Sequence, residues 1–228
     1  MIDKFVNSVA EALEGIKDGA TILVGGFGAV GQANQLIDGL IELGLRDLTV
    51  VANNAGYRQI GLARLLQLRR VRKIICSFPR IAGSTSFEDL YRAGEIELEL
   101  VPQGTLAERI RAAGAGVPAF FTATAAGTDL ALGKETREID GRTYVLENAL
   151  HGDVALVEAW RADRWGNLVY REAGRNFNPV MATAAALTIV QTQHVAKLGE
   201  IDPETIVTPG IFVNRVVHVP YGDPLIML

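Results

Sequence analysis

Short apolar runs alternate with amphipathic segments along the first half of the chain. The continuous runs Thr21–Gly25, "TILVG", and Lys73–Ser77, "KIICS", predict strands that are buried on both faces. Asn34–Gly44, "NQLIDGLIELG", has apolar residues at helical spacing, with Asn34 as the predicted N-cap. At the N-terminus, Phe5, Val9, Leu13 and Ile16 also recur at helical spacing, so we expect a helix there.

The same alternation continues as far as residue 114. Further strands are predicted within Asp47–Asn54, Arg72–Phe78 and Ile96–Gly104, and further helices within Arg58–Leu68, Ser86–Gly94 and Leu106–Gly114. Strand and helix in turn, at the short spacing of β-α-β units, predict an α/β fold. We expect an open, mostly parallel sheet with helices on both faces.

After about Phe121 the pattern contains more strands and fewer helices. Extra strands are predicted within Arg142–Glu147, Asp153–Trp160, Asn167–Arg171, Leu187–Thr192 and Phe212–Val219, and one clear helix within Asn178–Ala186. No linker rich in proline or serine separates the two halves. We therefore expect a single domain over residues 1–228.

Glycines crowd the turn after the first buried strand. Gly26, Gly28 and Gly31 spell G-x-G-x-x-G, which in a dinucleotide-binding fold is followed by an acidic residue at the end of the next strand. That strand ends instead in Asn53 and Asn54, and no G-K-[ST] of a phosphate-binding loop follows the glycines. Two interpretations of the turn stay open at this point. One is an anion bound at the free N–H groups of the next helix, and the other is a tight turn without any ligand.

Uncharged polar residues follow the other predicted strands. Asn53 and Asn54 come after the second strand, Ser77 after the third and Gln103 after the fourth. Because the carboxyl ends of parallel strands meet at one edge, these side chains should converge there. Their amides can donate hydrogen bonds to an oxyanion, but none is an obvious acid, base or nucleophile. The edge therefore has groups suited to binding a substrate and none suited to attacking it, as expected of one half of an active site.

Net charge and the content of cysteine and histidine argue against several classes of function. The formal charge of −4 and the lack of a long basic run argue against nucleic acid or an anionic membrane surface as a partner. The one cysteine, Cys76, falls in a buried strand and is expected to be a core residue of a cytoplasmic protein. Three scattered histidines give no metal-ligand spacing. The tail Pro224–Leu228 is too short to span a membrane, and we expect it to fray or to dock on a partner.

Several longer segments of the chain form a pattern when they are taken together. They are "DGATILVGGFGAVG" at Asp18–Gly31, "NNAG" at Asn53–Gly56, "VPQGTLAERIRAAGAGVPAFFT" at Val101–Thr122, "ETREIDGRTYVLE" at Glu135–Glu147, "DRWGNLVYR" at Asp163–Arg171, "RNFNP" at Arg175–Pro179 and "VTPGIFVNRVV" at Val207–Val217. In this order they resemble the A (alpha) subunit of the family I coenzyme A-transferases. The resemblance covers nearly the whole chain.

The resemblance implies a division of labour between two subunits. In this family a glutamate of the B subunit is the nucleophile and carries CoA as a thioester, so this chain would supply no nucleophile. Gln103 would support the thioester oxyanion, and Asn53 and Asn54 would line the pocket for the acid substrate. CoA would contact the glycine turn, which comprises Gly25, Gly26, Phe27, Gly28, Ala29, Val30 and Gly31.

The implied reaction moves CoA from succinyl-CoA to a 3-oxo acid, with 3-oxoadipate favoured. Acetoacetate as the acceptor, and thioester hydrolysis on the same fold, are the alternatives. The resemblance implies a B-subunit partner, an α2β2 assembly, CoA and succinyl-CoA as substrates, and no permanently bound cofactor or metal. Two departures concern loops: Ala33 replaces a family proline, and "TATAAGT" at Thr122–Thr128 replaces T-P-T-G-[YF]-G-T.

Overall fold

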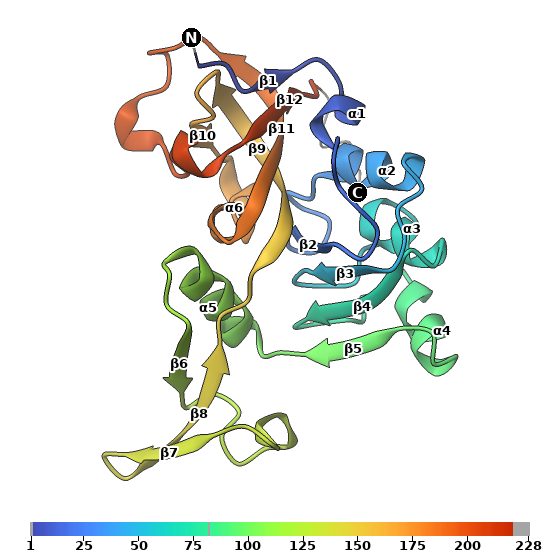
Figure 1. The fold of residues 1–228 in the computed structure, drawn as a ribbon, viewed down its shortest axis with the longest axis vertical. Coiled ribbons are helices and arrows are strands. Elements are labelled where there is room, and N and C mark those ends of the chain that lie inside the picture. Colours follow the sequence, from blue (N-terminus) through green and yellow to red (C-terminus); the bar gives the residue numbers. More distant parts are fainter. Residues whose placement is uncertain (1, 82, 221–228) are drawn as a thin grey trace.

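A single large sheet forms the centre of the molecule (Figure 1). The computed structural model describes residues 2–81 and 83–220, so the predicted tail Pro224–Leu228 lies outside the described residues. Within them the strand order is β1-β12-β11-β9-β2-β3-β4-β5, and β10 pairs antiparallel with β9. All the other neighbouring pairs are parallel. The strands are β1 Phe5–Val6, β2 Thr21–Val24, β3 Leu48–Val51, β4 Val71–Cys76, β5 Glu97–Leu100, β9 Gly152–Asp163, β10 Leu168–Val169, β11 Ala185–Ala196 and β12 Arg215–His218.

Helices cover both faces of this sheet, as the sequence predicted. Side chains alternate across β2, so Ile22 and Val24 pack in one core cluster and Leu23 in the other. The first cluster is closed by α1 Val9–Ala12, α2 Asn34–Glu42, α3 Gly61–Gln67 and α4 Ser86–Arg92, and the second by α5 Gln103–Gly114 and α6 Asn178–Thr183. No helix in the described part of the chain is long and apolar enough to cross a membrane.

A second, smaller sheet accounts for part of the extra strands in the C-terminal half. It is antiparallel, in the order β6-β8-β7, and Figure 1 shows it projecting below the main sheet. Its strands are β6 Ala119–Thr122, β7 Thr136–Ile139 and β8 Arg142–Asn148. β8 leads within a few residues into β9, which belongs to the main sheet. That the whole chain is one domain stays a prediction.

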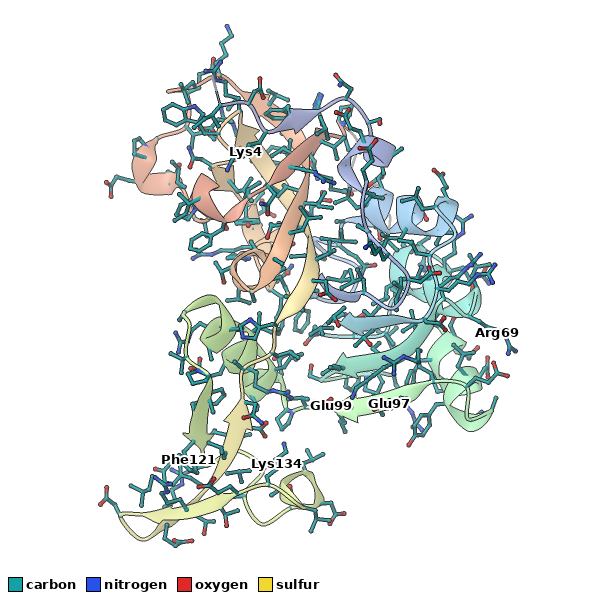
Figure 2. All side chains as sticks on the ribbon, viewed as in Figure 1. Lys4, Arg69, Glu97, Glu99, Phe121 and Lys134 are labelled. Atoms are coloured by element: carbon teal, nitrogen blue, oxygen red, sulfur yellow. The ribbon has the colours of Figure 1, made fainter. Side chains whose placement is uncertain are left out.

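A network of charged side chains ties the small sheet to the main body. Arg109 of α5 donates to Glu99 of β5 (2.8 Å) and to the backbone oxygen of Asn148 (2.8 Å). At the base of the small sheet, the buried carboxylate of Glu147 accepts from Lys134 (2.5 Å) and lies 3.9 Å from Arg109. Glu99 and Lys134 are labelled in Figure 2. Because Arg109 and Glu147 are mostly buried, solvent screens these contacts less than it screens a surface ion pair.

Two predictions of the local structure near helix ends were wrong. Phe5 lies in β1, paired with Val216, instead of in a helix, because the side chain of Ser8 accepts from Glu11 N and starts α1 only after that point. Asn34 is the first residue of α2 and does not cap it, since the cap residue is Ala33. Ala33 has φ −75°, which lies within the range that proline imposes, so a proline at this position would need no change in φ.

The loop after β6 contains a strained alanine. Ala125 has φ +67°, a left-handed conformation that glycine adopts readily and alanine does not. Its carbonyl accepts from the backbone N–H of Thr128 (3.1 Å) and from the hydroxyl of that residue (2.8 Å), which holds the turn in this geometry. The family pattern has glycine at this position, so the alanine is tolerated there against its conformational preference.

Replacing this alanine with glycine should stabilise the protein. The left-handed conformation costs an L-residue about 1–2 kcal/mol, and the greater freedom of glycine in the unfolded chain offsets about 0.4–1 kcal/mol of that gain. We expect Ala125→Gly to raise the free energy of unfolding in urea by about 0.5–1 kcal/mol. The control is Ala123→Gly, at a residue of the same loop without positive φ, which should lower it. An equal decrease in the free energy of unfolding in both variants would contradict a strained backbone at Ala125.

Candidate functional site

The polar residues that follow β3, β4 and β5 meet at one point, as predicted. Figure 1 shows the arrowheads of these three strands pointing to the same side of the sheet. There the Oδ1 atom of Asn53 accepts from the hydroxyl of Ser77 (2.7 Å) and from the amide Nε2 of Gln103 (2.8 Å). Asn53 is only 3% exposed, whereas Gln103 is exposed at the start of α5. The buried amide therefore orients an exposed one.

Asn54 sits beside this cluster but serves the backbone. Its Oδ1 accepts from the N–H of Gly56 (2.9 Å), which closes a local turn of the kind that asparagine favours. Its Nδ2 donates to the carbonyl of Gly28 (3.4 Å), so it joins the end of β3 to the glycine turn. The structure thus brings Asn53, Asn54, Gln103 and the turn together at one edge. Their roles toward substrates stay predictions.

The glycine turn is a small hairpin that stands clear of the following helix. Phe27 and Val30 exchange two backbone hydrogen bonds, of 3.0 and 3.1 Å, around Gly28 and Ala29. Gly28 has φ +62° at the first central position, where a two-residue type II′ hairpin turn needs glycine. A Cβ atom added to Gly28 would meet nothing within 4 Å, and Phe27 is 51% exposed. The tip is open on its outer side.

Two asparagines from the "RNFNP" segment clamp the base of this hairpin. Asn176 accepts from Gly26 N–H (3.0 Å) and donates to the carbonyl of Val30 (3.1 Å), so it bridges the two sides of the hairpin. Asn178 is fully buried and donates to the carbonyl of Gly31 (2.8 Å). These contacts span about 150 residues of sequence and fix the turn against the start of α6.

The clamp explains two of the glycines by internal packing. A Cβ atom at Gly25 would lie 1.9 Å from Oδ1 of Asn178, and one at Gly31 would lie 2.7 Å from the carbonyl oxygen of Gly174. The resemblance implies that CoA contacts the turn that contains these two glycines. At these two positions the close approach is instead made by the chain itself. Gly26, with φ +124°, is needed for its backbone conformation.

The N-terminus of α2 is not available to an anion in the way the glycine pattern indicated. The N–H groups of Gln35 and Leu36 both donate to Oε1 of Gln191, from β11, at 3.2 Å. The buried side chain of Gln191 therefore takes two of the donors that a helix start leaves unpaired. This contact removes the physical basis for a dinucleotide or bare phosphate at the helix end.

A buried carboxylate, to which the sequence assigned no site role, lies next to the turn. Glu158 of β9 is 5% exposed and accepts from the side chains of Gln191 and Gln193 of β11, the latter at 2.9 Å. It lines a cavity of about 340 Å³ whose wall also includes Val30 and Gly31 of the turn. Polar residues at alternate positions inside two long apolar strands, in "ALVEAW" and "TIVQTQ", were the available signal.

The cysteine is a core residue, as predicted. Cys76 is fully buried in β4, and burial raises the pKa of its thiol to about 12, so the reactive thiolate does not form near neutral pH. In the described residues, no group of three or more His, Cys, Asp or Glu side chains is placed to hold a metal ion. Asn53, Ser77 and Gln103 bring two side-chain amides and a hydroxyl to this edge.

Comparison with known proteins gives the family. The model of the coenzyme A transferase family matches residues 6–219. The chain belongs to the coenzyme A transferase family. It is 63% identical over 219 residues to the A subunit of 3-oxoadipate CoA-transferase from Pseudomonas putida, with 96% of this chain and 95% of that protein covered.

Two further comparisons extend this likeness, one to a second curated protein and one to a solved structure. The probable A subunit of the succinyl-CoA:3-ketoacid coenzyme A transferase from Bacillus subtilis is 50% identical, with 94% of this chain and 89% of that protein covered. The acyl-CoA transferase structure from E. coli O157:H7 has the same fold, with a TM-score of 0.82, 22% identity and 96% of this chain covered. This chain spans about half of that longer chain, 48% of its length.

The clamp predicts a large effect of one buried side chain on stability. Asn178→Ala would leave the carbonyls of Gly31 and Gly174 and the N–H of Glu158 without their partner. A buried polar group that loses its partner costs about 1–3 kcal/mol, so we expect the free energy of unfolding to fall by about 3 kcal/mol or more. Urea denaturation measures it. Asn7→Ala, at an exposed asparagine, is the control and should stay within about 0.5 kcal/mol of the parent protein. A similar small change at Asn178 would contradict the clamp.

Proposed function

We propose that this chain is the A subunit of a heteromeric CoA-transferase that moves CoA from succinyl-CoA to a 3-oxo acid. The identity of 63% to a 3-oxoadipate CoA-transferase subunit over nearly the full length of both chains supports 3-oxoadipate as the favoured acceptor. The 50% identity to a probable succinyl-CoA:3-ketoacid transferase subunit keeps acetoacetate as the alternative acid. CoA and its thioesters are substrates in this proposal, and no permanently bound cofactor takes part. The proposal places the enzyme in the cytoplasm.

The observation that carries the proposal is the chemistry of the strand ends. Asn53, Ser77 and Gln103 converge, and none of them is a carboxylate, a thiol or a histidine. A transferase that works through a covalent thioester needs a nucleophilic carboxylate at this point. The partner B subunit would supply that glutamate, so the two chains would form the active site together, in an α2β2 assembly.

Exposed aromatic side chains flank the same edge and support a partner there. Phe27 at the tip of the glycine turn is 51% exposed, and Phe78, next to Ser77, is 60% exposed. Large apolar side chains that lie exposed beside a polar site are typical of a surface that another protein covers. The relatives that match over most of their own length are named as A subunits, which supports the same idea.

Within this proposal each predicted site residue has a task. The turn Gly25–Gly31 contacts CoA, with the open tip at Gly28 as the nearest approach. The Gln103 amide, oriented by its bond to Asn53, donates to the oxyanion that forms at the thioester carbon. Asn53 and Asn54 line the acid pocket, and the hydrogen bond from Asn54 to the carbonyl of Gly28 fixes this side of the pocket relative to the turn.

Co-expression of this chain with the product of the adjacent open reading frame, as the candidate B subunit, tests the proposal. CoA transfer from succinyl-CoA is followed spectrophotometrically with 3-oxoadipate and acetoacetate in parallel, and a reaction without acceptor acid measures hydrolysis. We expect transfer only when both chains are present, with 3-oxoadipate preferred. Transfer by this chain alone would contradict the division of labour. Continued loss of succinyl-CoA without an acceptor, beyond the one equivalent per active site that forms the enzyme-bound thioester, would favour a hydrolase.

Gln103 should affect turnover more than binding. Gln103→Ala removes a donor that acts on charge developing in the transition state, so we expect kcat to fall about 10²-fold. The affinity for CoA should change little, because free CoA has no acyl oxygen to which the Gln103 amide could donate. Gln67→Ala, at an exposed glutamine at the end of α3, is the matched control and should leave both quantities unchanged. Equal losses in kcat and in CoA affinity would assign Gln103 to simple binding.

A further inference from the structure

The loops at the carboxyl ends of β3 and β4 carry positive charge in an acidic protein. Residues 52–60 join β3 to α3, and residues 77–85 join β4 to α4. These two loops contain two arginines, Arg58 and Arg80, and no aspartate or glutamate, although the whole chain has a formal charge of −4. They also carry Asn53, Asn54 and Ser77. The candidate site is therefore flanked by loops that attract an anion.

The two loops contact each other at the site and again further along the chain. Just beyond the strands, Asn54 and Phe78 form a parallel β-bridge. Further along, a Cβ atom added to Gly83 of the second loop would lie 3.9 Å from Cγ of Arg58 and 4.0 Å from Cε2 of Tyr57. The side chain of Arg58 therefore begins between the two loops that carry the polar residues of the site.

The guanidinium of Arg58 is held in place without an acidic partner. It lies over the ring of Tyr57, 5.1 Å from the ring centroid, which is within the range of a cation–π contact. Among the described residues, none forms an ion pair or a hydrogen bond with this exposed guanidinium. Its N–H donors, which form a planar fork that matches a carboxylate, are therefore available to a ligand.

The backbone around Arg58 sets the direction in which its side chain leaves the loop. Arg58 has φ +52°, a left-handed conformation that is uncommon for residues other than glycine and that occurs often at functional sites. The turn before it is closed by Asn54, whose Oδ1 accepts from the N–H of Gly56 (2.9 Å). The turn that fixes Asn54 therefore also fixes the start of the Arg58 side chain.

The other arginine of the two loops has an acidic neighbour. The Nε atom of Arg80 lies 3.9 Å from Oε1 of Glu88 at the start of α4. A carboxylate at this distance balances part of the charge of Arg80. Arg58 is therefore the cation of these loops whose charge no carboxylate of the described residues balances.

The two candidate acceptor acids differ in the negative charge that they bring to this edge. 3-Oxoadipate and acetoacetate share the 3-oxo acid half whose carboxylate takes up CoA, but only 3-oxoadipate has a second carboxylate at its far end. Arg58 follows Asn54 by four residues, which even an extended chain spans in at most about 14 Å. The phosphates of CoA are separated from the thioester by the whole pantetheine arm. Of the anionic groups of the reactants, the distal carboxylate is therefore the one nearest to the reacting carbon.

We propose that Arg58 selects the acceptor acid by binding the distal carboxylate of 3-oxoadipate. The inference rests on the proposed function, because it concerns the acid that accepts CoA there. The guanidinium donates to both oxygens of the carboxylate, which a lysine ammonium in the same place does less well. Acetoacetate ends in a methyl group at this point and gains nothing from the contact. Arg58 thus acts on the end of the acid that distinguishes the two acceptors, and Gln103 acts on the end that they share.

Exchange of the guanidinium for an uncharged amide tests this assignment. Complexes of both subunits are prepared with Arg58→Gln, with Arg58→Lys and, as the matched control, with Arg80→Gln. Both arginines are exposed, so we expect each variant to fold, and thermal unfolding and size-exclusion chromatography check folding and assembly. The kcat/KM of each acceptor is measured for 3-oxoadipate and acetoacetate, because in a ping-pong mechanism this quantity does not depend on the donor half-reaction. Calorimetry measures the affinity for CoA.

The expected result is a loss confined to the acid with two carboxylates. Arg58→Gln should lower kcat/KM for 3-oxoadipate about tenfold or more, as expected for lost hydrogen bonds between charged groups, and leave that for acetoacetate unchanged. Arg58→Lys should recover part of this loss, because it restores the charge without the planar fork. Arg80→Gln should leave the ratio of the two kcat/KM values unchanged.

Three outcomes would overturn the proposal. The first is an equal loss for both acids, or no loss for either, in the folded Arg58→Gln complex. The second is a selective loss for 3-oxoadipate in Arg80→Gln alone, which would assign the distal carboxylate to Arg80. The third is a lower CoA affinity or a failure to assemble in Arg58→Gln, which would assign Arg58 to the phosphates of CoA or to the subunit interface.

Binding of simple acids in the absence of CoA separates this proposal from the proposed function. Ligand-observed NMR compares adipate, which has two carboxylates, with butyrate, which has one, on the parent and Arg58→Gln complexes. We expect the variant to lose affinity for adipate and not for butyrate. A parent complex that shows this difference but transfers no CoA would contradict the proposed function alone. Transfer by the parent complex together with unchanged adipate affinity in the variant would contradict the role of Arg58 alone.

Discussion

The structure of this edge depends on two asparagine side chains that hold a glycine hairpin from the far end of the chain. Asn176 bonds Gly26 and Val30, and Asn178 bonds Gly31 so closely that Gly25 has no room for a Cβ atom. A buried amide is well suited to such a clamp, because it satisfies backbone donors and acceptors at once and loses about 1–3 kcal/mol for each group left unpaired. The hairpin is therefore fixed at its base to the start of α6.

Side-chain amides also hold the other polar groups of the site in position. Asn53 orients Gln103, Asn54 reaches the carbonyl of Gly28, and Gln191 closes the start of α2 while it holds Glu158. These groups change no charge when a substrate arrives, so they can be fixed before it binds. Such preorganisation is what stabilisation of a developing oxyanion requires. It supplies no nucleophile, which is why the covalent step is assigned to a second chain.

Local sequence patterns predicted most of the elements and one half of the site. Buried strands and amphipathic helices follow from periodicity, and the meeting of Asn53, Ser77 and Gln103 follows from parallel strands that end at one edge. The predictions that were wrong concern positions whose structure is set by contacts with residues far away in the sequence. Phe5 joins β12 by pairing with Val216. The start of α2 is capped by Gln191, which lies about 155 residues away. The Asn176 and Asn178 clamp was visible only as a family segment, since no local pattern says what an asparagine will bond.

The division of the active site between two chains is tested by the mass of each chain after reaction with the donor. The complex is incubated with succinyl-CoA in the absence of an acceptor acid, and each intact chain is then weighed by mass spectrometry under conditions that preserve thioesters. We expect a CoA adduct on a glutamate of the B subunit, while the mass of this chain stays unmodified. An adduct on this chain, at Glu158 or at any other glutamate, would contradict the divided site.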